Sequence, residues 1–291
     1  MTFTAQSIQN GLKSVGYVCE PRLALAMSMA IRLERPLLLE GDAGVGKTYL
    51  AEAAAQALER TLIRLQCYEG LDAHQTIYEW NYSRQMLAIA RAGHAVGEMR
   101  EEDLFDESYL IERPLLKAIR QSEAPVLLID EVDRADEEFE AYLLEILSEY
   151  QVSVPELGVI KARSKPLTII TSNGVRDLSD ALRRRCLFHH IDYPDMATEL
   201  RIIQTRIPAC STALAQNIAG FVAALRKEDL QKSPGIAETL DWTAALLGCE
   251  IENIADDPEQ VHATLLCLLK TKADQDAIPF PVFQRLAAAV A

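Results

Sequence analysis

The sequence predicts an α/β protein in which a mainly parallel sheet lies between helices and is followed by a smaller, all-helical domain. Three observations lead to this prediction. Short apolar runs alternate with helical patterns, a glycine-rich segment joins the first run to a helix, and strand patterns stop near Pro194. We therefore expect an α/β core over residues 1–195 and a helical domain over residues 196–291.

The first strand and its flanking helices can be placed from the pattern of apolar residues. Pro21 to Leu33 has helical spacing, and Arg35-Pro36 ends this pattern. Leu37 to Leu39 is then a candidate for a buried strand. Tyr49 to Glu59 is rich in alanine and other helix formers, so the predicted order is strand, glycine loop, helix.

The rest of the core continues the alternation. Further strands are expected at Leu62 to Leu65, Val126 to Ile129, Leu167 to Thr171 and Phe188 to Ile191, and helices at Pro114 to Gln121 and Glu137 to Tyr150. Gly70 to Arg113 lacks a sustained period and predicts an insertion built around short helices, whereas Gln151 to Ala162 predicts a β-hairpin. The helical domain should contain helices at Thr198 to Arg206, Ala213 to Lys227, Ile236 to Leu247 and Pro258 to Lys270.

Composition narrows the class of protein. Acidic residues outnumber basic ones by 43 to 29, which opposes general nucleic-acid binding. No apolar run is long enough to span a bilayer, and Met1 to Lys13 lacks the layout of a signal peptide, so a cytoplasmic protein is expected. The six cysteines are scattered without a C-x-x-C pair, which favours reduced, structural thiols.

The strongest motif is the glycine-rich segment, in which Gly41-Asp42-Ala43-Gly44-Val45-Gly46-Lys47-Thr48 fits the P-loop pattern. Its glycines allow backbone N–H groups to surround phosphates, and the following helix adds the positive end of its dipole. We expect Gly41 to Tyr49 to contact ATP, with Lys47 at the β- and γ-phosphates and the Thr48 hydroxyl on Mg²⁺. The alternative is a glycine turn without a ligand.

Two acids, Asp130 and Glu131, end an apolar strand, where a parallel sheet would bring them to the edge next to the P-loop. Asp130 is the candidate Mg²⁺ ligand, and Glu131 is the candidate base that orients and deprotonates the attacking water. The alternative is that both acids only stabilise the start of the following helix through its dipole.

Polar residues elsewhere are candidates for contacts with the transferred phosphate. Asn173 ends another strand and could bind the water or the γ-phosphate, although asparagine is also common in turns. Arg183 to Arg185 follow a short helix and could enter a neighbouring subunit's site, or simply form a solvated basic run. Arg134 could pair with Glu131 or face an adjacent subunit.

His189 and His190 are neighbours in a predicted strand and therefore point to opposite faces, which argues against a joint metal site.

Together, Gly41 to Thr48, Val126 to Glu131, Thr171 to Asn173 and Arg183 to Arg185 resemble the core of an AAA+ ATPase in order and spacing. Asp130 to Ala135, the insertion and the hairpin before Leu167 resemble more narrowly the MoxR family of the helix-2-insert group. Cys67 to Gly70 and Tyr78 to Tyr82 look like the branch that accompanies aerobic carbon monoxide dehydrogenase.

This resemblance implies an ATPase that forms a ring, usually a hexamer, with ATP bound between subunits. It implies that Arg185, or Arg184 beside it, is the arginine finger and that Asn173 is the polar sensor. It also implies a chaperone-like task, in which the ATPase and a partner with a von Willebrand factor A domain activate a metalloenzyme during cofactor maturation. Related proteins often carry a lid arginine in a Ser-Pro-Arg motif, but here Gly235 follows Ser233-Pro234, which leaves Lys232 as a weak substitute.

Other functions remain compatible with these residues. Lys161, Arg163 and Lys165 flank the predicted hairpin, so a DNA-translocating or DNA-remodelling AAA+ motor is the main alternative. A small-molecule P-loop kinase would transfer phosphate as a monomer. A scaffold switched by ATP binding alone would need no hydrolysis.

Overall fold

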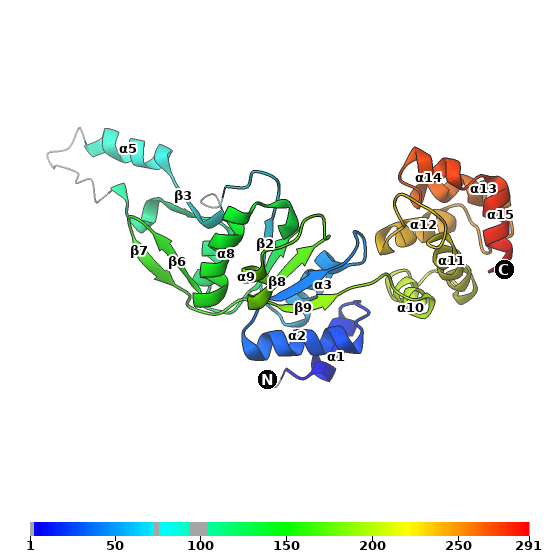
Figure 1. Cartoon of the computed structure of the whole chain (residues 1–291), viewed down its shortest axis with the longest axis horizontal. Coiled ribbons are helices and arrows are strands. Elements are labelled where there is room, and N and C mark those ends of the chain that lie inside the picture. The colour runs from blue at the N-terminus through cyan, green and yellow to red at the C-terminus, as the bar shows by residue number, and fades with distance from the viewer. Residues whose placement is uncertain (1–2, 73–75, 93–103, 291) are drawn as a thin grey trace. The chain divides into compact units, whose positions relative to one another are not determined.

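The computed structural model of the chain describes residues 3–72, 76–92 and 104–290. It separates into two compact units, which we call the sheet unit and the helical unit (Figure 1). The sheet unit contains Met1–Gly11, Pro21–Glu40 and Ala51–His190, and the helical unit contains Leu12–Glu20, Gly41–Leu50 and Ile191–Ala291. The glycine-rich segment therefore groups with the C-terminal helices, and the division expected at residue 195 stays a prediction.

A five-stranded parallel sheet forms the centre of the sheet unit, in the order β2-β5-β8-β1-β9. The strands are β1 (Leu37–Glu40), β2 (Leu62–Gln66), β5 (Val126–Asp130), β8 (Leu167–Ser172) and β9 (Leu187–His190). The central strands β5 and β8 are buried along their whole length, as expected for parallel strands covered on both faces. The predicted α/β class and the predicted strands are confirmed.

The strand register aligns the carboxyl ends of the strands. Gln66 pairs with Asp130, and Leu39 pairs with Thr171 on one side and His189 on the other. Because β5 and β8 are also parallel neighbours, all five strands end at the same edge of the sheet. β1 ends there at Glu40, and the glycine-rich segment follows directly in the chain. Open α/β sheets bind their ligands at this edge.

The helices of the sheet unit lie close to their predicted positions. They are α2 (Pro21–Leu33), α7 (Pro114–Arg120), α8 (Glu137–Glu149) and α9 (Asp180–Arg185), and α3 (Lys47–Ala57) begins within the glycine-rich segment. Asp136 caps α8 by accepting a hydrogen bond from the N–H of Phe139 at 2.8 Å. α9 corrects one prediction, because Arg183 to Arg185 form its last turn rather than following it.

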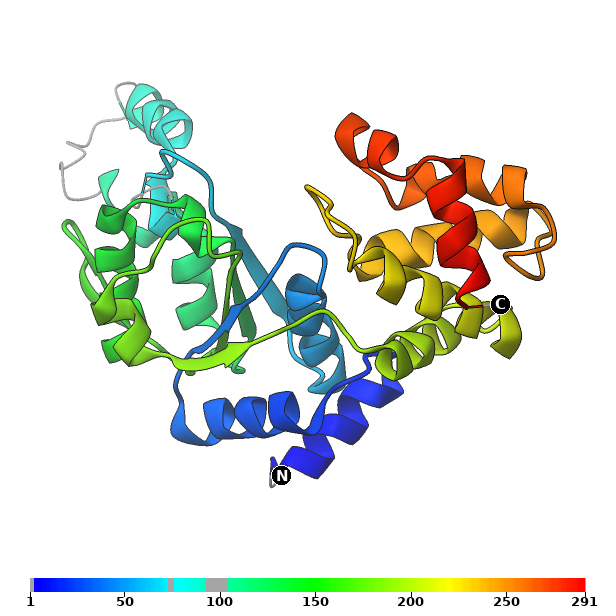
Figure 2. The same cartoon turned by 45° about the vertical axis from the view of Figure 1, so that its right-hand side comes forward.

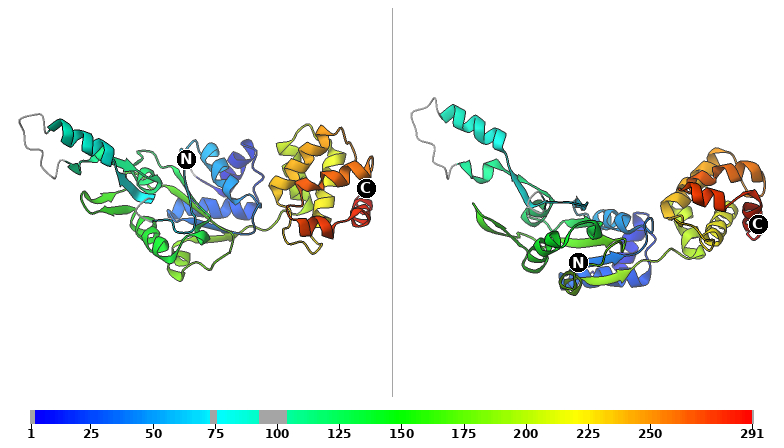
Figure 3. Two further views of the ribbon diagram at one scale, coloured as in Figure 1. Left: turned by 90° about the horizontal axis from the view of Figure 1, so that it is seen from above. Right: turned by 45° about the horizontal axis from the view of Figure 1, so that its top comes forward.

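Two antiparallel ribbons extend from the sheet unit, and Figure 3 shows both at the same end of it. The predicted hairpin is confirmed as β6 (Gln151–Val154) and β7 (Gly158–Lys161). The second ribbon, β3 (Tyr78–Trp80) with β4 (Leu110–Glu112), was not predicted, since three-residue strands are too short to show alternation. It accompanies helix α5 (Tyr82–Ala92) and the short helix η1 (Glu107–Tyr109). Residues 73–75 and 93–103 of the predicted insertion lie outside the described residues.

The C-terminal helices gather around a core of their own (Figure 2). They are α10 (Met196–Arg206), α11 (Thr212–Leu225), α12 (Ile236–Gly248), α13 (Pro258–Ala263), η3 (Thr264–Cys267), α14 (Lys272–Ala277) and α15 (Phe280–Ala288). The fully buried rings of Phe221 and Trp242 lie 5.1 Å apart at the centre of this core.

The sequence predicted only part of this arrangement. The continuous helix expected from Pro258 to Lys270 is wrong, because α13 ends at Ala263 and a 3₁₀ helix replaces its second half. α14 and α15 were not predicted, nor was α1 (Ala5–Ser14). α14 has only six residues, so it is too short to show a helical period.

All six cysteines are free thiols. Among the described helices, none is long and apolar enough to cross a membrane.

Candidate nucleotide site

The glycine-rich segment adopts a conformation that its glycines make possible. Gly44 and Gly46 have positive φ angles of 83° and 96°, which side chains other than glycine rarely adopt. A Cβ atom at Gly41 would lie 2.1 Å from the carbonyl oxygen of Ile191. Glycine is therefore required at these positions by backbone conformation or by close approach, as the P-loop interpretation expects.

Lys47 begins α3 and turns its side chain back onto the loop. The side chain is buried, and Nζ donates hydrogen bonds to the carbonyl oxygens of Gly41 and Asp42, each at 2.7 Å. This arrangement holds an ammonium group inside a loop that ends at a helix N-terminus. Both features favour an anion, so the residues present fit the phosphates of a nucleotide.

Tyr49, the last residue of the predicted nucleotide-contact segment, has aromatic and cationic neighbours within the helical unit. Its ring centre lies 5.8 Å from that of Tyr17, and the Arg206 guanidinium lies 4.6 Å above the ring while also donating to the phenol oxygen. Burial raises the pKa of Tyr17, so its phenol stays neutral. Tyr49 is thus fixed in place by α10 and by the segment before α2.

Asp130 is a buried carboxylate at the end of β5. Its Oδ1 accepts a hydrogen bond from the Thr171 hydroxyl at 2.6 Å, and its Oδ2 accepts one from Arg64, also at 2.6 Å. A carboxylate oxygen carries two lone pairs, so one oxygen can accept a hydrogen bond and also bind a metal ion. Hard oxygen ligands suit Mg²⁺, which proteins commonly bind through one or two carboxylates together with substrate phosphates.

Glu131 has a backbone conformation that is unusual for glutamate, with a φ angle of 55°. Its N–H donates to the Thr171 hydroxyl at 2.8 Å, which fixes the residue at the sheet edge. Its carboxylate pairs with Arg134 at 2.8 Å and accepts from the Asn173 amide at 3.4 Å. Of the two alternatives for Arg134, the structure has the local ion pair.

Asn173 and Glu131 therefore lie side by side although they are 42 positions apart in the chain. Asp133 holds Asn173 in place, because its buried Oδ2 accepts hydrogen bonds from the N–H groups of Asn173 and Val175 at 3.1 and 2.9 Å. The sheet edge thus gathers Asp130, Glu131 and Asn173 into one cluster, which we call the sheet-edge cluster.

Replacing Asp133 by Ala tests this positioning. Two partly buried N–H groups would lose a charged acceptor, so the free energy of unfolding should fall by about 1–3 kcal/mol. ATP turnover should also fall, because Asn173 loses its anchor. Asp133→Asn keeps an acceptor oxygen at the same place and should retain most of the stability and most of the ATP turnover. Urea unfolding and phosphate-release assays measure the two effects. An Ala variant with wild-type turnover would show that Asn173 needs no such support.

Several residues that contact the sheet-edge cluster were not predicted from the sequence. Arg64 and Gln66 of β2 bind Asp130 and Glu131, the latter through the Gln66 amide at 3.2 Å. Cys67 follows them, and its N–H donates to the carbonyl oxygen of Asp130 at 2.8 Å. Burial, with a contribution from nearby Asp130, raises the pKa of the Cys67 thiol to about 12, so it stays neutral. Gln66 could have been identified only as a polar residue at the end of a predicted strand.

The three consecutive arginines of α9 have different surroundings. Arg183 pairs with Glu40 at 2.9 Å. Arg184 and Arg185 are exposed, and their carbonyl oxygens accept hydrogen bonds from Arg35 at 2.6 and 3.1 Å. Within the described part of the chain, neither of these two guanidinium groups has an ion pair. β9 begins at Leu187, opposite the first residue of β1, so Arg184 and Arg185 precede the amino edge of the sheet, whereas the sheet-edge cluster of the same chain lies at the carboxyl edge.

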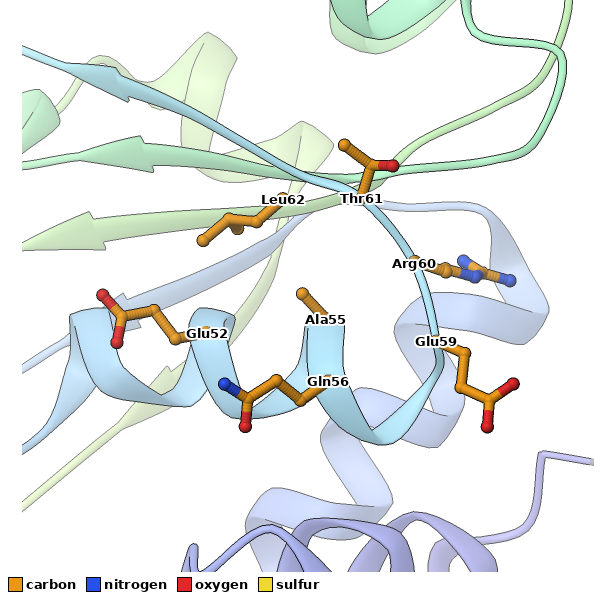
Figure 4. A pocket seen from close by; sticks show the side chains of 7 residues that line it. All are labelled: Glu52, Ala55, Gln56, Glu59, Arg60, Thr61 and Leu62. Carbon is orange, nitrogen blue, oxygen red and sulfur yellow. The ribbon is translucent and has the colours of Figure 1, made fainter.

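Metal sites of other kinds have no support in the described residues. No group of three or more His, Cys, Asp or Glu side chains there could hold a metal ion. A pocket does occur at the C-terminal end of α3, the end opposite the P-loop, where Glu52, Glu59 and Arg60 contribute to its lining (Figure 4). Its lining contains none of the predicted site residues.

The fold and the sheet-edge cluster define a P-loop ATPase of the AAA+ class. More particularly, the chain belongs to the family of AAA domains described as the dynein-related subfamily, whose model matches residues 36–186, just over half of the chain. The match extends from the start of β1 through the P-loop and the sheet-edge cluster to the end of α9. As a member of this family, the chain binds nucleotide and has ATPase activity.

Named relatives agree with this class. Gas vesicle ATPase GvpN2 of Halobacterium salinarum is 24% identical over 265 residues, which cover 87% of this chain and 73% of that protein. Gas vesicle ATPase GvpN of Ancylobacter aquaticus is 29% identical over 239 residues, which cover 78% of this chain and 65% of that protein. A RuvB mutant from Thermotoga maritima has a similar fold, with a TM-score of 0.50 and 18% identity over 90% of this chain and 70% of that one.

Proposed function

We propose that ATP binds at Gly41 to Tyr49 and is hydrolysed at the sheet-edge cluster. The observation that carries this proposal is the register of the sheet, which ends β5, β8 and β1 at one edge. Asp130, Glu131 and Asn173 lie at this edge, and the chain passes from the end of β1 directly into the P-loop. Thr48 and Asp130 would hold Mg²⁺, which would neutralise charge on the phosphate oxygens when bound. Lys47 supplies a second positive charge from the loop.

In this proposal Glu131 takes a proton from the attacking water. The water oxygen forms a bond to the γ-phosphorus, and the bond from that phosphorus to the β–γ bridging oxygen breaks, which gives ADP and phosphate. The Asn173 amide orients the water or a γ-phosphate oxygen beside Glu131. Its 3.4 Å contact with the Glu131 carboxylate keeps the two groups together.

Arg185, with Arg184 as the neighbouring candidate, acts in this proposal on the ATP of an adjacent subunit. Both side chains are exposed at the end of α9 while their backbone is fixed by Arg35, so they can extend toward another molecule. A site completed by a second copy requires an oligomer, and we propose a ring, in the form of a hexamer.

The work driven by hydrolysis is proposed to be chaperone-like remodelling of a partner protein in the cytoplasm. The MoxR resemblance supports this role, together with a von Willebrand A-domain partner and a metalloenzyme client such as an aerobic carbon monoxide dehydrogenase. A net charge of −14 favours protein over nucleic acid as the client. The names of the gas vesicle ATPases support a second candidate, an ATPase that serves gas vesicles.

The DNA-motor alternative receives less support from the hairpin cations. Lys165 pairs with Glu34 at 2.5 Å and lies over the Tyr150 ring, so it is engaged within its own chain. The fold shared with RuvB, at 18% identity, carries no argument about DNA.

ATP turnover in the presence of different partners tests these proposals. We expect stimulation by a purified von Willebrand A-domain protein, and none by duplex DNA at 50 or 200 mM salt. Stimulation by DNA that weakens with salt and is lost when Lys161 and Arg163 are replaced by Ala would favour the DNA motor instead. Co-purification with gas vesicle proteins, without an effect of the A-domain protein, would favour the second candidate.

A further inference from the structure

A turn of the helical unit touches the P-loop through backbone atoms. This turn, Ser233 to Ile236, precedes α12, and the N–H of Ile236 donates to the carbonyl oxygen of Gly44 at 2.9 Å. A Cβ atom on Gly235 would lie 2.7 Å from the Gly44 Cα and 2.9 Å from its carbonyl oxygen. The two backbones therefore meet at a distance that only glycine permits, and a larger residue at position 235 is incompatible with the contact.

The contact has a direct consequence for the loop. In a trans peptide unit the C=O and the N–H point in opposite directions. Because the turn binds the carbonyl oxygen of Gly44, the N–H of Val45 in the same unit must point away from the turn. P-loops bind phosphate through N–H groups of this kind. The turn thus fixes the orientation of one loop peptide before a nucleotide is present.

Arg226, at the end of α11, fixes the turn in its place. Its Nε donates to the carbonyl oxygen of Pro234 at 2.9 Å, and its two terminal nitrogens donate to the Glu199 carboxylate at 2.6 and 2.8 Å. The guanidinium also lies 4.8 Å from the ring centre of Tyr193. All four of these residues belong to the helical unit, so α10 and α11 together hold one side of the turn.

The other side of the turn is held by the start of α12. The Thr239 N–H donates to the carbonyl oxygen of Gly235 at 3.1 Å, and the Thr239 hydroxyl donates to Glu199 at 2.7 Å. The N–H of Gly235 donates in turn to the Glu238 carboxylate at 3.1 Å. Glu199 is fully buried. Its carboxylate binds Arg226 on one side of the turn and Thr239 on the other, so it connects the two sides.

A buried ion pair of this kind is weak evidence for a role in stability, because desolvation can offset the attraction. Its contacts point instead to a role in placing the turn. We propose that Arg226 is a positioning residue for ATP binding, which acts through the turn to orient the Gly44–Val45 peptide. The proposal rests on ATP binding at the P-loop. The helical unit thus meets the loop by backbone contact at Gly235 and Ile236.

Gly235→Ala tests the contact without straining its own backbone, since Gly235 has a φ angle of −85° that alanine adopts freely. The added methyl group would separate the turn from Gly44. We expect Kd and KM for ATP to rise about three- to tenfold, the loss that one hydrogen bond allows, with kcat nearly unchanged. Gly248→Ala, at the other end of α12 with open space around its Cβ, is the matched control and should behave as wild type.

Arg226→Lys tests the positioning role. Lysine cannot bind Pro234 and both Glu199 oxygens together, so KM should rise again with kcat nearly unchanged. If Arg226 acts through the turn, the double variant with Gly235→Ala should bind ATP no more weakly than the weaker single variant. Additive losses, or wild-type affinity in Gly235→Ala, would overturn the inference. Absence of ATP binding by the wild-type chain would instead overturn the proposed site itself.

Discussion

The Arg185→Ala variant is expected to bind ATP normally and to hydrolyse it on the order of 10³–10⁵-fold more slowly, the range for loss of an arginine finger. Binding should persist because the exposed Arg185 is separate from the sheet-edge cluster of its own chain. Hydrolysis should fail because the guanidinium no longer neutralises charge on the phosphate transferred in the neighbouring subunit. Phosphate release and nucleotide binding, measured on the same preparation, separate the two effects.

Arg183→Ala is the matched control for this prediction. Arg183 lies on the same turn of α9 but is paired with Glu40, so its loss should affect stability more than catalysis. Arg184→Ala decides which of the two exposed arginines reaches the neighbour. A normal rate of hydrolysis in both the Arg184→Ala and the Arg185→Ala variants would show that neither arginine acts in catalysis.

The Glu131→Gln variant is expected to retain ATP affinity and to lose turnover by roughly 10²–10⁴-fold, the usual contribution of a general base. Glutamine can keep the hydrogen bonds to Arg134 and Asn173 through its amide oxygen, so the local structure should persist. It cannot accept the proton of the attacking water. Glu138→Gln removes one exposed acid from the first turn of α8 and should leave turnover unchanged.

Mixing the two inactive variants tests whether sites are shared. A ring that contains Glu131→Gln and Arg185→Ala subunits has some interfaces with an intact Glu131 on one side and an intact Arg185 on the other. Turnover should therefore reappear on mixing, with a maximum at an intermediate ratio. No recovery at any ratio would contradict catalysis between subunits.

Local sequence patterns were sufficient for much of this site. The P-loop is a contiguous motif, and Asp130 and Glu131 stand at the end of an apolar run, so both could be placed before the sheet order was known. The sensor candidate Asn173 follows the same rule at the end of β8. These predictions depend on consecutive residues and on the general property that parallel strands end at one edge.

The remaining contacts depend on which strands are neighbours. Arg64 and Asp130 meet only because β2 pairs with β5, and nothing within either segment predicts that pairing. The contact of Gly235 with Gly44 joins segments about 190 residues apart. The sequence shows that glycine follows Ser233-Pro234, but the close backbone approach that requires glycine there is visible only in the structure.

The ribbon of β3 and β4 shows a similar limit. Its partners are three-residue strands separated by helix α5, so neither carries enough alternation to be recognised. The hairpin of β6 and β7 was predictable because its strands are adjacent in the chain and joined by a turn that contains glycine.

The most direct test of the account is the affinity of the purified chain for ATP with and without Mg²⁺, compared with that of Lys47→Ala, by isothermal titration calorimetry. Lys47 Nζ is the charge that the P-loop holds at its centre, bonded to Gly41 and Asp42. We predict binding that Mg²⁺ strengthens and that falls about ten- to a hundredfold in Lys47→Ala, as expected for loss of a charge-assisted contact. Equal affinity in the two proteins, or no effect of Mg²⁺, would contradict a nucleotide site at this loop.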